Sequence, residues 1–101
     1  MKNDHIAEIG IDESQRLYVT PAKKAFPYIY RAAMEVYWDP GRKRLFSPKP
    51  KEWSYSRWYQ QILAAVEDEY GTRLSLSSRT KWVNVDNELK EAILKSTIGL
   101  A

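Results

Sequence analysis

The feature that most constrains this chain is an apolar stripe in its second half. Within residues 55–70, six large side chains recur at the spacing of one face of an α-helix: Tyr55, Tyr59, Ile62, Leu63, Val66 and Tyr70. Gly71 follows, where a left-handed residue commonly ends a helix. A helix with one apolar face needs a second layer to cover that face. The stripe therefore predicts a long helix that begins between residues 52 and 54 and packs on a sheet.

Two hairpins in the first half of the chain are expected to supply that sheet. Residues 5–11 alternate, with Ala7, Ile9 and Ile11 on one side, and residues 16–20 return after the polar sequence DESQ. The second hairpin is centred on DPGR, where Pro40 and Gly41 suit a type II turn with a positive φ at the glycine. Residues 43–46 (KRLF) then form its returning strand.

The clearest strand pattern covers residues 28–38. Its even positions are all apolar or aromatic: Tyr28, Tyr30, Ala32, Met34, Val36 and Trp38. Its odd positions are mixed and include Arg31 and Glu35. We therefore expect one strand with its even side chains against the core, as in a sheet with one buried face.

The C-terminal third predicts two short strands and a second helix. The strand candidates are TRLSL and KWVNV, and Asp86 is a suitable N-cap for a helix with a stripe of Leu89, Ile93 and Leu94. The element order indicates one α+β domain over residues 1–101. We expect an antiparallel sheet of four to five strands covered on one face by the long helix, plus a short C-terminal helix. The strand order stays open.

Composition excludes several classes of site. The chain has no cysteine, which removes disulfides, thiolate metal sites and cysteine nucleophiles and fits a reducing compartment. Its first residues contain no long apolar run typical of a signal peptide, and no apolar run approaches the length of a membrane span. We expect a cytoplasmic protein without a cofactor or a metal.

Motifs for catalysis are missing from the sequence. It contains no G-x-G-x-x-G, no phosphate-binding loop sequence and no H-E-x-x-H, and His5 is its only histidine. Glu35, beside Arg31 on the mixed face of its strand, could act as an acid or base if a second layer covered that face. The alternative is an exposed cross-strand ion pair. We therefore predict that the protein is not an enzyme.

Aromatic and basic residues gather in the middle of the chain. Ten of the thirteen aromatic residues lie between residues 26 and 59, and the segment 42–57 carries six basic residues and one acid. That segment has a charge of +5, within a total of +3. Trp53 and Tyr37 do not fit the apolar stripe of the helix. We predict a binding surface that consists of Trp53, Arg57, Lys49, Lys51, Tyr37 and Lys43.

This surface allows two kinds of partner. Trp, Tyr and Arg are the residues that anchor protein interfaces, so the first hypothesis is a protein partner, including a second copy of the chain. Such a copy could dock through an edge strand or through the face of the helix that carries Trp53. The alternative hypothesis is single-stranded nucleic acid, whose bases stack on aromatic rings while lysines contact phosphates. A structural interpretation also stays open, in which Trp53 packs under the proline-rich segment before the helix.

The span YRAAMEVYWDPGRKRLFSPKPKEWSYSRWYQQI resembles small uncharacterised bacterial proteins of the type carried on integron and mobile gene cassettes. The resemblance covers about a third of the chain and contains no diagnostic motif. It implies a small bacterial protein with a binding or adaptive role, and it transfers no functional residue.

Overall fold

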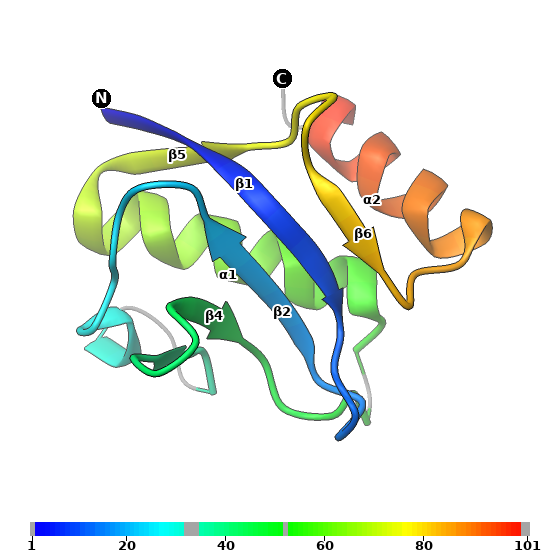
Figure 1. The fold of residues 1–101 in the computed structure, drawn as a ribbon, viewed down its shortest axis with the longest axis horizontal. Coiled ribbons are helices and arrows are strands. Elements are labelled where there is room, and N and C mark those ends of the chain that lie inside the picture. Colours follow the sequence, from blue (N-terminus) through cyan, green and yellow to red (C-terminus); the bar gives the residue numbers. More distant parts are fainter. Residues whose placement is uncertain (1, 32–34, 52, 100–101) are drawn as a thin grey trace.

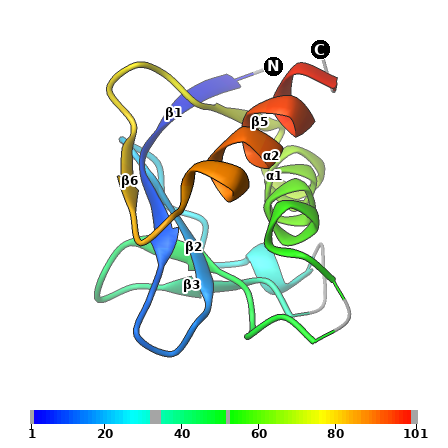
Figure 2. The same ribbon diagram turned by 90° about the vertical axis from the view of Figure 1, so that its right-hand side faces the viewer.

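The computed structural model describes residues 2–31, 35–51 and 53–99, which form a sheet with two helices on one side (Figures 1 and 2). The elements follow in the order β1 (Lys2–Ile11), β2 (Leu17–Pro21), the 3₁₀ turn η1 (Ile29–Arg31), β3 (Tyr37–Asp39), β4 (Arg44–Phe46), α1 (Tyr55–Tyr70), β5 (Thr72–Ser75), β6 (Lys81–Val83) and α2 (Asn87–Gly99). The predicted α+β class, with a long helix over one sheet face and a short C-terminal helix, is confirmed.

The sheet is mixed, whereas an antiparallel sheet was expected. Its strand order is β3-β4-β2-β1-β5, and β6 also pairs with β1. The pairs β1–β2, β2–β4 and β3–β4 are antiparallel, but β5 and β6 run parallel to β1. Parallel pairing requires a crossover connection, and α1 provides it by carrying the chain back along the sheet before β5 begins.

The strand register sorts side chains onto two faces of the sheet, because directly paired residues point the same way. The row on the helix side consists of Trp38, Leu45, Val19, Ile9 and Trp82, and the row on the opposite side consists of Tyr37, Phe46, Tyr18, Gly10 and Val83. The first row joins the buried residues of α1 in one hydrophobic core. In the second row, the Tyr37 ring stacks on Phe46 at 5.3 Å.

The N-terminal hairpin forms as predicted, but its alternation is interrupted. The register of β1 against β2 shifts between Ile6 and Glu8, which indicates a β-bulge. Ile6 and Ile9 are therefore both buried, whereas Ala7 is exposed. The prediction that Ala7 shares the core-facing side with Ile9 was wrong, because the bulge moves Ala7 to the solvent.

The predicted strand over residues 28–38 was wrong for most of its length. Backbone N–H groups of Ile29 and Arg31 donate to the carbonyls of Phe26 and Tyr28, so the chain turns there. Tyr28 and Tyr30 are 54% and 61% exposed, and they do not enter the core. Ala32 and Met34 lie outside the described residues, and the strand itself contains only Tyr37–Asp39.

The β3–β4 hairpin is confirmed, but its turn differs from the expected type II geometry. The Asp39 carboxylate accepts hydrogen bonds from the backbone N–H groups of Gly41 and Arg42, at 3.0 and 3.1 Å. The residue with positive φ is Lys43, at 55°, and not Gly41. The side chain of Asp39 therefore organises the turn, as aspartate often does through its own following amides.

Helix α1 begins and ends as predicted, and α2 has its predicted start. The Ser54 hydroxyl caps α1 by accepting from the Arg57 N–H at 3.3 Å, and Gly71 ends the helix at φ 59°. Asp86 caps α2 by accepting from the Leu89 N–H at 2.7 Å. Trp58, in the first turn of α1, is buried. Neither helix is long and apolar enough to cross a membrane, a finding limited to the residues described.

Candidate functional site

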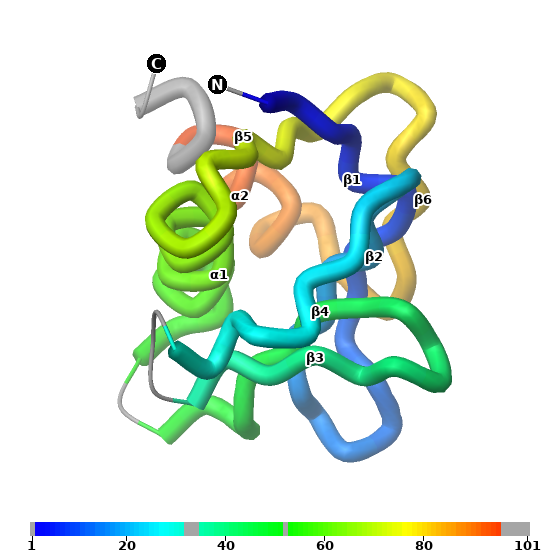
Figure 3. The backbone as a smooth tube through the Cα atoms, turned by 90° about the vertical axis from the view of Figure 1, so that its left-hand side faces the viewer, coloured from blue at the N-terminus to red at the C-terminus, as the bar shows by residue number. Residues whose placement is uncertain are grey.

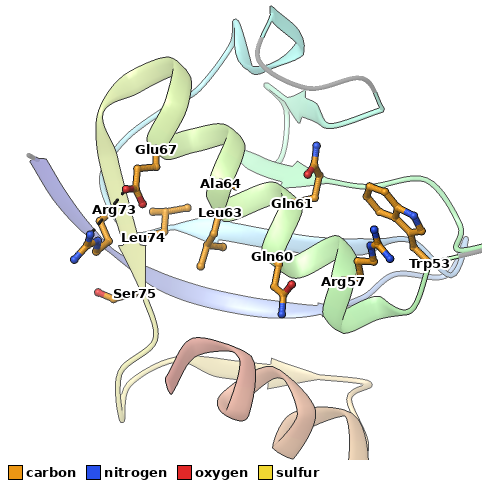
Figure 4. Close-up of a pocket in the computed structure, with 10 residues that line it drawn as sticks. All are labelled: Trp53, Arg57, Gln60, Gln61, Leu63, Ala64, Glu67, Arg73, Leu74 and Ser75. Atoms are coloured by element: carbon orange, nitrogen blue, oxygen red, sulfur yellow. Dashed lines mark ion pairs between the residues drawn. The ribbon is translucent and has the colours of Figure 1, made fainter. Parts of the chain in front are cut away.

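A groove of about 620 Å³ runs along α1 and is lined by that helix, by Trp53 before it and by strand β5 (Figure 4). We call it the α1 groove. The described residues that line it are Trp53, Arg57, Gln60, Gln61, Leu63, Ala64, Glu67, Arg73, Leu74 and Ser75. Its volume lies in the range of sites that bind small molecules.

One end of the α1 groove is built by three neighbouring side chains at the start of the helix. The ring centres of Trp53 and Trp58 are 4.8 Å apart, and the Arg57 guanidinium lies 4.5 Å from the centre of the Trp53 ring. Because Trp58 is buried, it provides a fixed base on which the half-buried Trp53 rests. An aromatic pair and a cation–π contact of this kind each contribute on the order of 1 kcal/mol. The indole of Trp53 and the guanidinium of Arg57 are therefore held in position by contacts within the chain.

The middle and the far end of the α1 groove have a different chemistry. Leu63 and Ala64 of α1 and Leu74 of β5 provide apolar surface, and Gln60 and Gln61 add amide groups that donate and accept hydrogen bonds. At the far end, Glu67 and Arg73 form an ion pair with 3.9 Å between carboxylate oxygen and guanidinium nitrogen. Figure 4 shows this pair and the Trp53–Arg57 pair at opposite ends of the row of labelled side chains. The groove thus combines an apolar centre with polar and charged ends.

The structure brings together only part of the predicted binding surface. Trp53 and Arg57 are in direct contact, and Lys49 and Lys51 are exposed in the segment that leads to them. Tyr37, 43% exposed, lies on the opposite face of the sheet in the register row with Phe46. Lys43 lies in the β3–β4 turn, which extends on the side of the sheet away from α1 (Figures 2 and 3). These last two residues belong to a separate surface.

Glu35 does not have the environment that an acid or base would need. It is exposed, has φ at 67°, and precedes β3, so it does not lie mid-strand. The expected neighbour Arg31 places its guanidinium 5.6 Å from the centre of the Tyr28 ring. The hypothetical second layer over Glu35 is not formed by any described residue.

Sequence reasoning missed the part of the α1 groove that lies beyond Gln61. Ala64 and Glu67 continue the spacing of Trp53, Arg57 and Gln60 along the polar side of the helix. This helical spacing is visible in the sequence and could have predicted that both residues lie on the same surface. Arg73 and Leu74 carry no such signal, because they approach α1 only through the pairing of β5 with β1. Leu63, which was assigned to the core stripe, does pack against the core, but it is half-buried and also forms part of the wall of the groove.

Comparisons with known proteins agree with the resemblance seen in the sequence. No curated protein matches the chain. The chain is similar to a solved structure described as an integron cassette protein, Hfx_Cass5, from the mobile metagenome of the North West Arm Sewage Outfall. The two are 47% identical over 97% of this chain and 98% of the other, with a TM-score of 0.49. The family model of the integron cassette protein Hfx_Cass5 matches residues 4–80. The chain therefore belongs to the Hfx_Cass5 family of integron cassette proteins.

Proposed function

We propose that this protein is a non-enzymatic binding module that recognises another protein through the α1 groove. The observation that carries the proposal is the Trp53–Arg57 pair, which is fixed on Trp58 at one end of the groove. Tryptophan and arginine are the residues most enriched at the energetic centres of protein interfaces. The absence of cysteine fits a role in a reducing compartment such as the cytoplasm.

The chemistry of the groove suits a segment of polypeptide. Its apolar centre accepts aliphatic side chains, and the amides of Gln60 and Gln61 can satisfy backbone groups that become desolvated on binding. Arg57 and the exposed Lys51 favour an acidic residue at the Trp53 end. We therefore expect the preferred segment to carry an acidic residue next to aliphatic ones.

Single-stranded nucleic acid has less support as a partner. Phosphate tracking needs several cations along one surface. Lys43 lies in the β3–β4 turn on the other side of the sheet, and the far end of the α1 groove carries the Glu67 carboxylate. The protein-binding proposal does not need a continuous basic track.

Selection of peptides by the wild-type protein and by a charge-reversed variant tests the proposal. A random peptide library displayed on phage is selected against the wild-type protein and, in parallel, against Arg57→Glu. We expect the wild type to enrich peptides with acidic residues beside aliphatic ones and Arg57→Glu to enrich basic peptides, because the substitution inverts the charge beside Trp53. Lys43→Glu makes the same change in charge at the β3–β4 turn and should select the same peptides as the wild type.

The selected peptides then allow a direct measurement. Binding of a wild-type-selected peptide, followed by calorimetry, should weaken at least about tenfold for Trp53→Ala, because loss of an interface tryptophan typically costs more than about 1 kcal/mol. The proposal fails if Trp53→Ala stays folded, as judged by circular dichroism, and binds the peptide as well as the wild type. It also fails if the wild type and Arg57→Glu enrich the same sequences.

A further inference from the structure

The charges of α1 are arranged against its own dipole. The helix begins with YSRW and ends with EDEY, so Arg57 lies near the positive N-terminal end and Glu67 and Asp68 lie near the negative C-terminal end. Each charge placed in this way costs an isolated helix about 0.3–1 kcal/mol. Glu67 has Arg73 as a neighbour, but Asp68 has no ion-pair partner among the described residues. Both ends of the outer face of α1 therefore present charge that the monomer does not balance.

These charges are placed symmetrically along one line of the helix. Arg57, Gln61, Ala64 and Asp68 follow one another at intervals of four, three and four residues, which keeps them on one side. This side is opposite to the buried side of α1, which contains Tyr59, Ile62 and Val66. Arg57 and Asp68 are about 16 Å apart along the axis, given a rise of about 1.5 Å per residue. In two antiparallel copies of α1, Arg57 would face Asp68 and Gln61 would face Ala64, at both ends alike.

We propose that the partner in the α1 groove is a second copy of this chain, whose α1 packs antiparallel on the first about a two-fold axis. This inference rests on the proposed function, because Arg57, Gln61 and Ala64 line the α1 groove and Asp68 continues the same line of the helix beyond it. A two-fold axis requires a self-complementary surface. The outer face of α1 meets this requirement because its two ends carry opposite charge.

The side chains near the two-fold axis permit close packing. Ala64 is small and exposed, so the opposing helix can approach closely there. Gln61 of each copy can donate to and accept from a neighbouring amide across the axis. Trp53, which precedes Arg57, would extend past the end of the other helix toward the start of its β5. One helix face buries less than the area of a standard interface, so the dimer should be weak and sensitive to salt.

Two charge reversals test the arrangement. Arg57→Glu and Asp68→Arg each introduce a like-charge contact at both ends of the proposed dimer. Both substitutions also correct the charge of α1 relative to its dipole, so neither should unfold the monomer. Sedimentation velocity at low ionic strength should show self-association that is at least about tenfold weaker for each variant alone than for the wild type.

A mixture of the two variants provides the most stringent test of the proposed dimer. In an equimolar mixture, the carboxylate introduced by Arg57→Glu in one chain faces the guanidinium introduced by Asp68→Arg in the other. At the opposite end, the native Asp68 of the first chain faces the native Arg57 of the second, so a heterodimer should form. Lys43→Glu changes the charge equally at a remote turn and should self-associate like the wild type. A mixture that stays monomeric, or an Arg57→Glu variant that dimerises like the wild type, would overturn the inference.

The outcomes separate this inference from the proposed function. A wild-type protein that stays monomeric at high concentration and low salt, but binds selected peptides through Trp53, would refute the second copy and leave the protein-binding groove intact. If neither peptide binding nor self-association responds to Trp53→Ala and Arg57→Glu, both proposals fall. Restored association in the mixture, with Lys43→Glu unchanged, supports both.

Discussion

Tyr18 links three elements on the face of the sheet opposite the helices. Its hydroxyl donates to the Glu8 carboxylate at 2.6 Å, and the Arg44 guanidinium lies 3.9 Å from the centre of its ring. Burial, followed by the hydrogen bond to Glu8, raises the pKa of Tyr18 to about 12 from an ordinary value of 10.0. The neutral hydroxyl is thus favoured in the folded protein.

This shift predicts a loss of stability at high pH. The pKa of Tyr18 is higher in the folded state than in the unfolded state, so its contribution is complete below about pH 10 and disappears as the pH rises toward about 12. Urea unfolding at a series of pH values should show a steeper fall in the free energy of unfolding for the wild type than for Tyr18→Phe. If the free energy of unfolding falls equally with pH for the two proteins across this range, the raised pKa of Tyr18 is contradicted.

Gly10 is required by the packing above it. A Cβ atom at this position would lie 2.6 Å from the Val83 carbonyl oxygen and 2.8 Å from the Tyr18 hydroxyl oxygen. Gly10→Ala should therefore destabilise the protein by about 1–3 kcal/mol, measured by urea denaturation. Gly41→Ala is the matched control, because its Cβ would approach only the Asp39 carboxylate at 3.4 Å, and its effect should stay within about 0.5 kcal/mol. Equal effects of the two substitutions would show that the close approach at Gly10 is relieved by small shifts.

At the scale of elements, the start of α1 connects stability to the α1 groove. Ser54 caps the first turn, and that turn carries Arg57 and follows Trp53 directly. Ser54→Ala should lower the free energy of unfolding by about 1 kcal/mol and should also weaken binding in the groove, because the turn that holds the guanidinium frays. Asp86→Ala removes the cap of α2 and should cost a similar amount without affecting binding. Identical peptide affinities for both variants would show that the Ser54 cap does not affect binding in the α1 groove.

Elements with local signals were predictable from the sequence, and elements with non-local causes were not. The limits of α1 follow from its stripe, from the hydroxyl of Ser54 and from the left-handed residue Gly71, all of which act within a few residues. The segment 28–38 shows equally good alternation, yet a 3₁₀ turn and the positive φ of Glu35 break it. The parallel pairing of β5 and β6 with β1 depends on the path of the whole chain, so no local pattern contains it.

At the scale of the whole molecule, the same distinction explains the candidate site. Trp53 and Arg57 could be associated from the sequence because they lie four positions apart at a helix start. Tyr37 could not be placed, because a shift of one residue in strand register moves a side chain to the other face of the sheet. Lys43 could not be placed, because the direction of its turn depends on how the β3–β4 hairpin joins the sheet. The register places Tyr37 in the row of Phe46 and Tyr18, on the side away from α1. The predicted six-residue surface therefore divides between two sides of the molecule.

The molecule as a whole has one sheet face with helices and one without. The two sides differ in whether their exposed aromatic residues are covered by other side chains. On the face without helices, Arg16 and Arg44 lie over the rings of Phe46 and Tyr18 at 4.6 and 3.9 Å and cover them. On the outer side of α1, the Trp53–Arg57 pair lines an open groove. This difference is why we assign association to the α1 groove and not to the sheet.

The most direct test of this assignment follows the indole N–H resonance of Trp53 in ¹⁵N-labelled protein as the protein concentration rises at low salt. The Trp53→Phe variant identifies the resonance, and the indole of Trp82, which lies against Lys90, serves as an internal reference. We predict that the Trp53 resonance shifts with concentration, that added salt reverses the shift, and that the Trp82 resonance stays in place. A Trp53 resonance that remains fixed while sedimentation shows dimers forming would contradict the account.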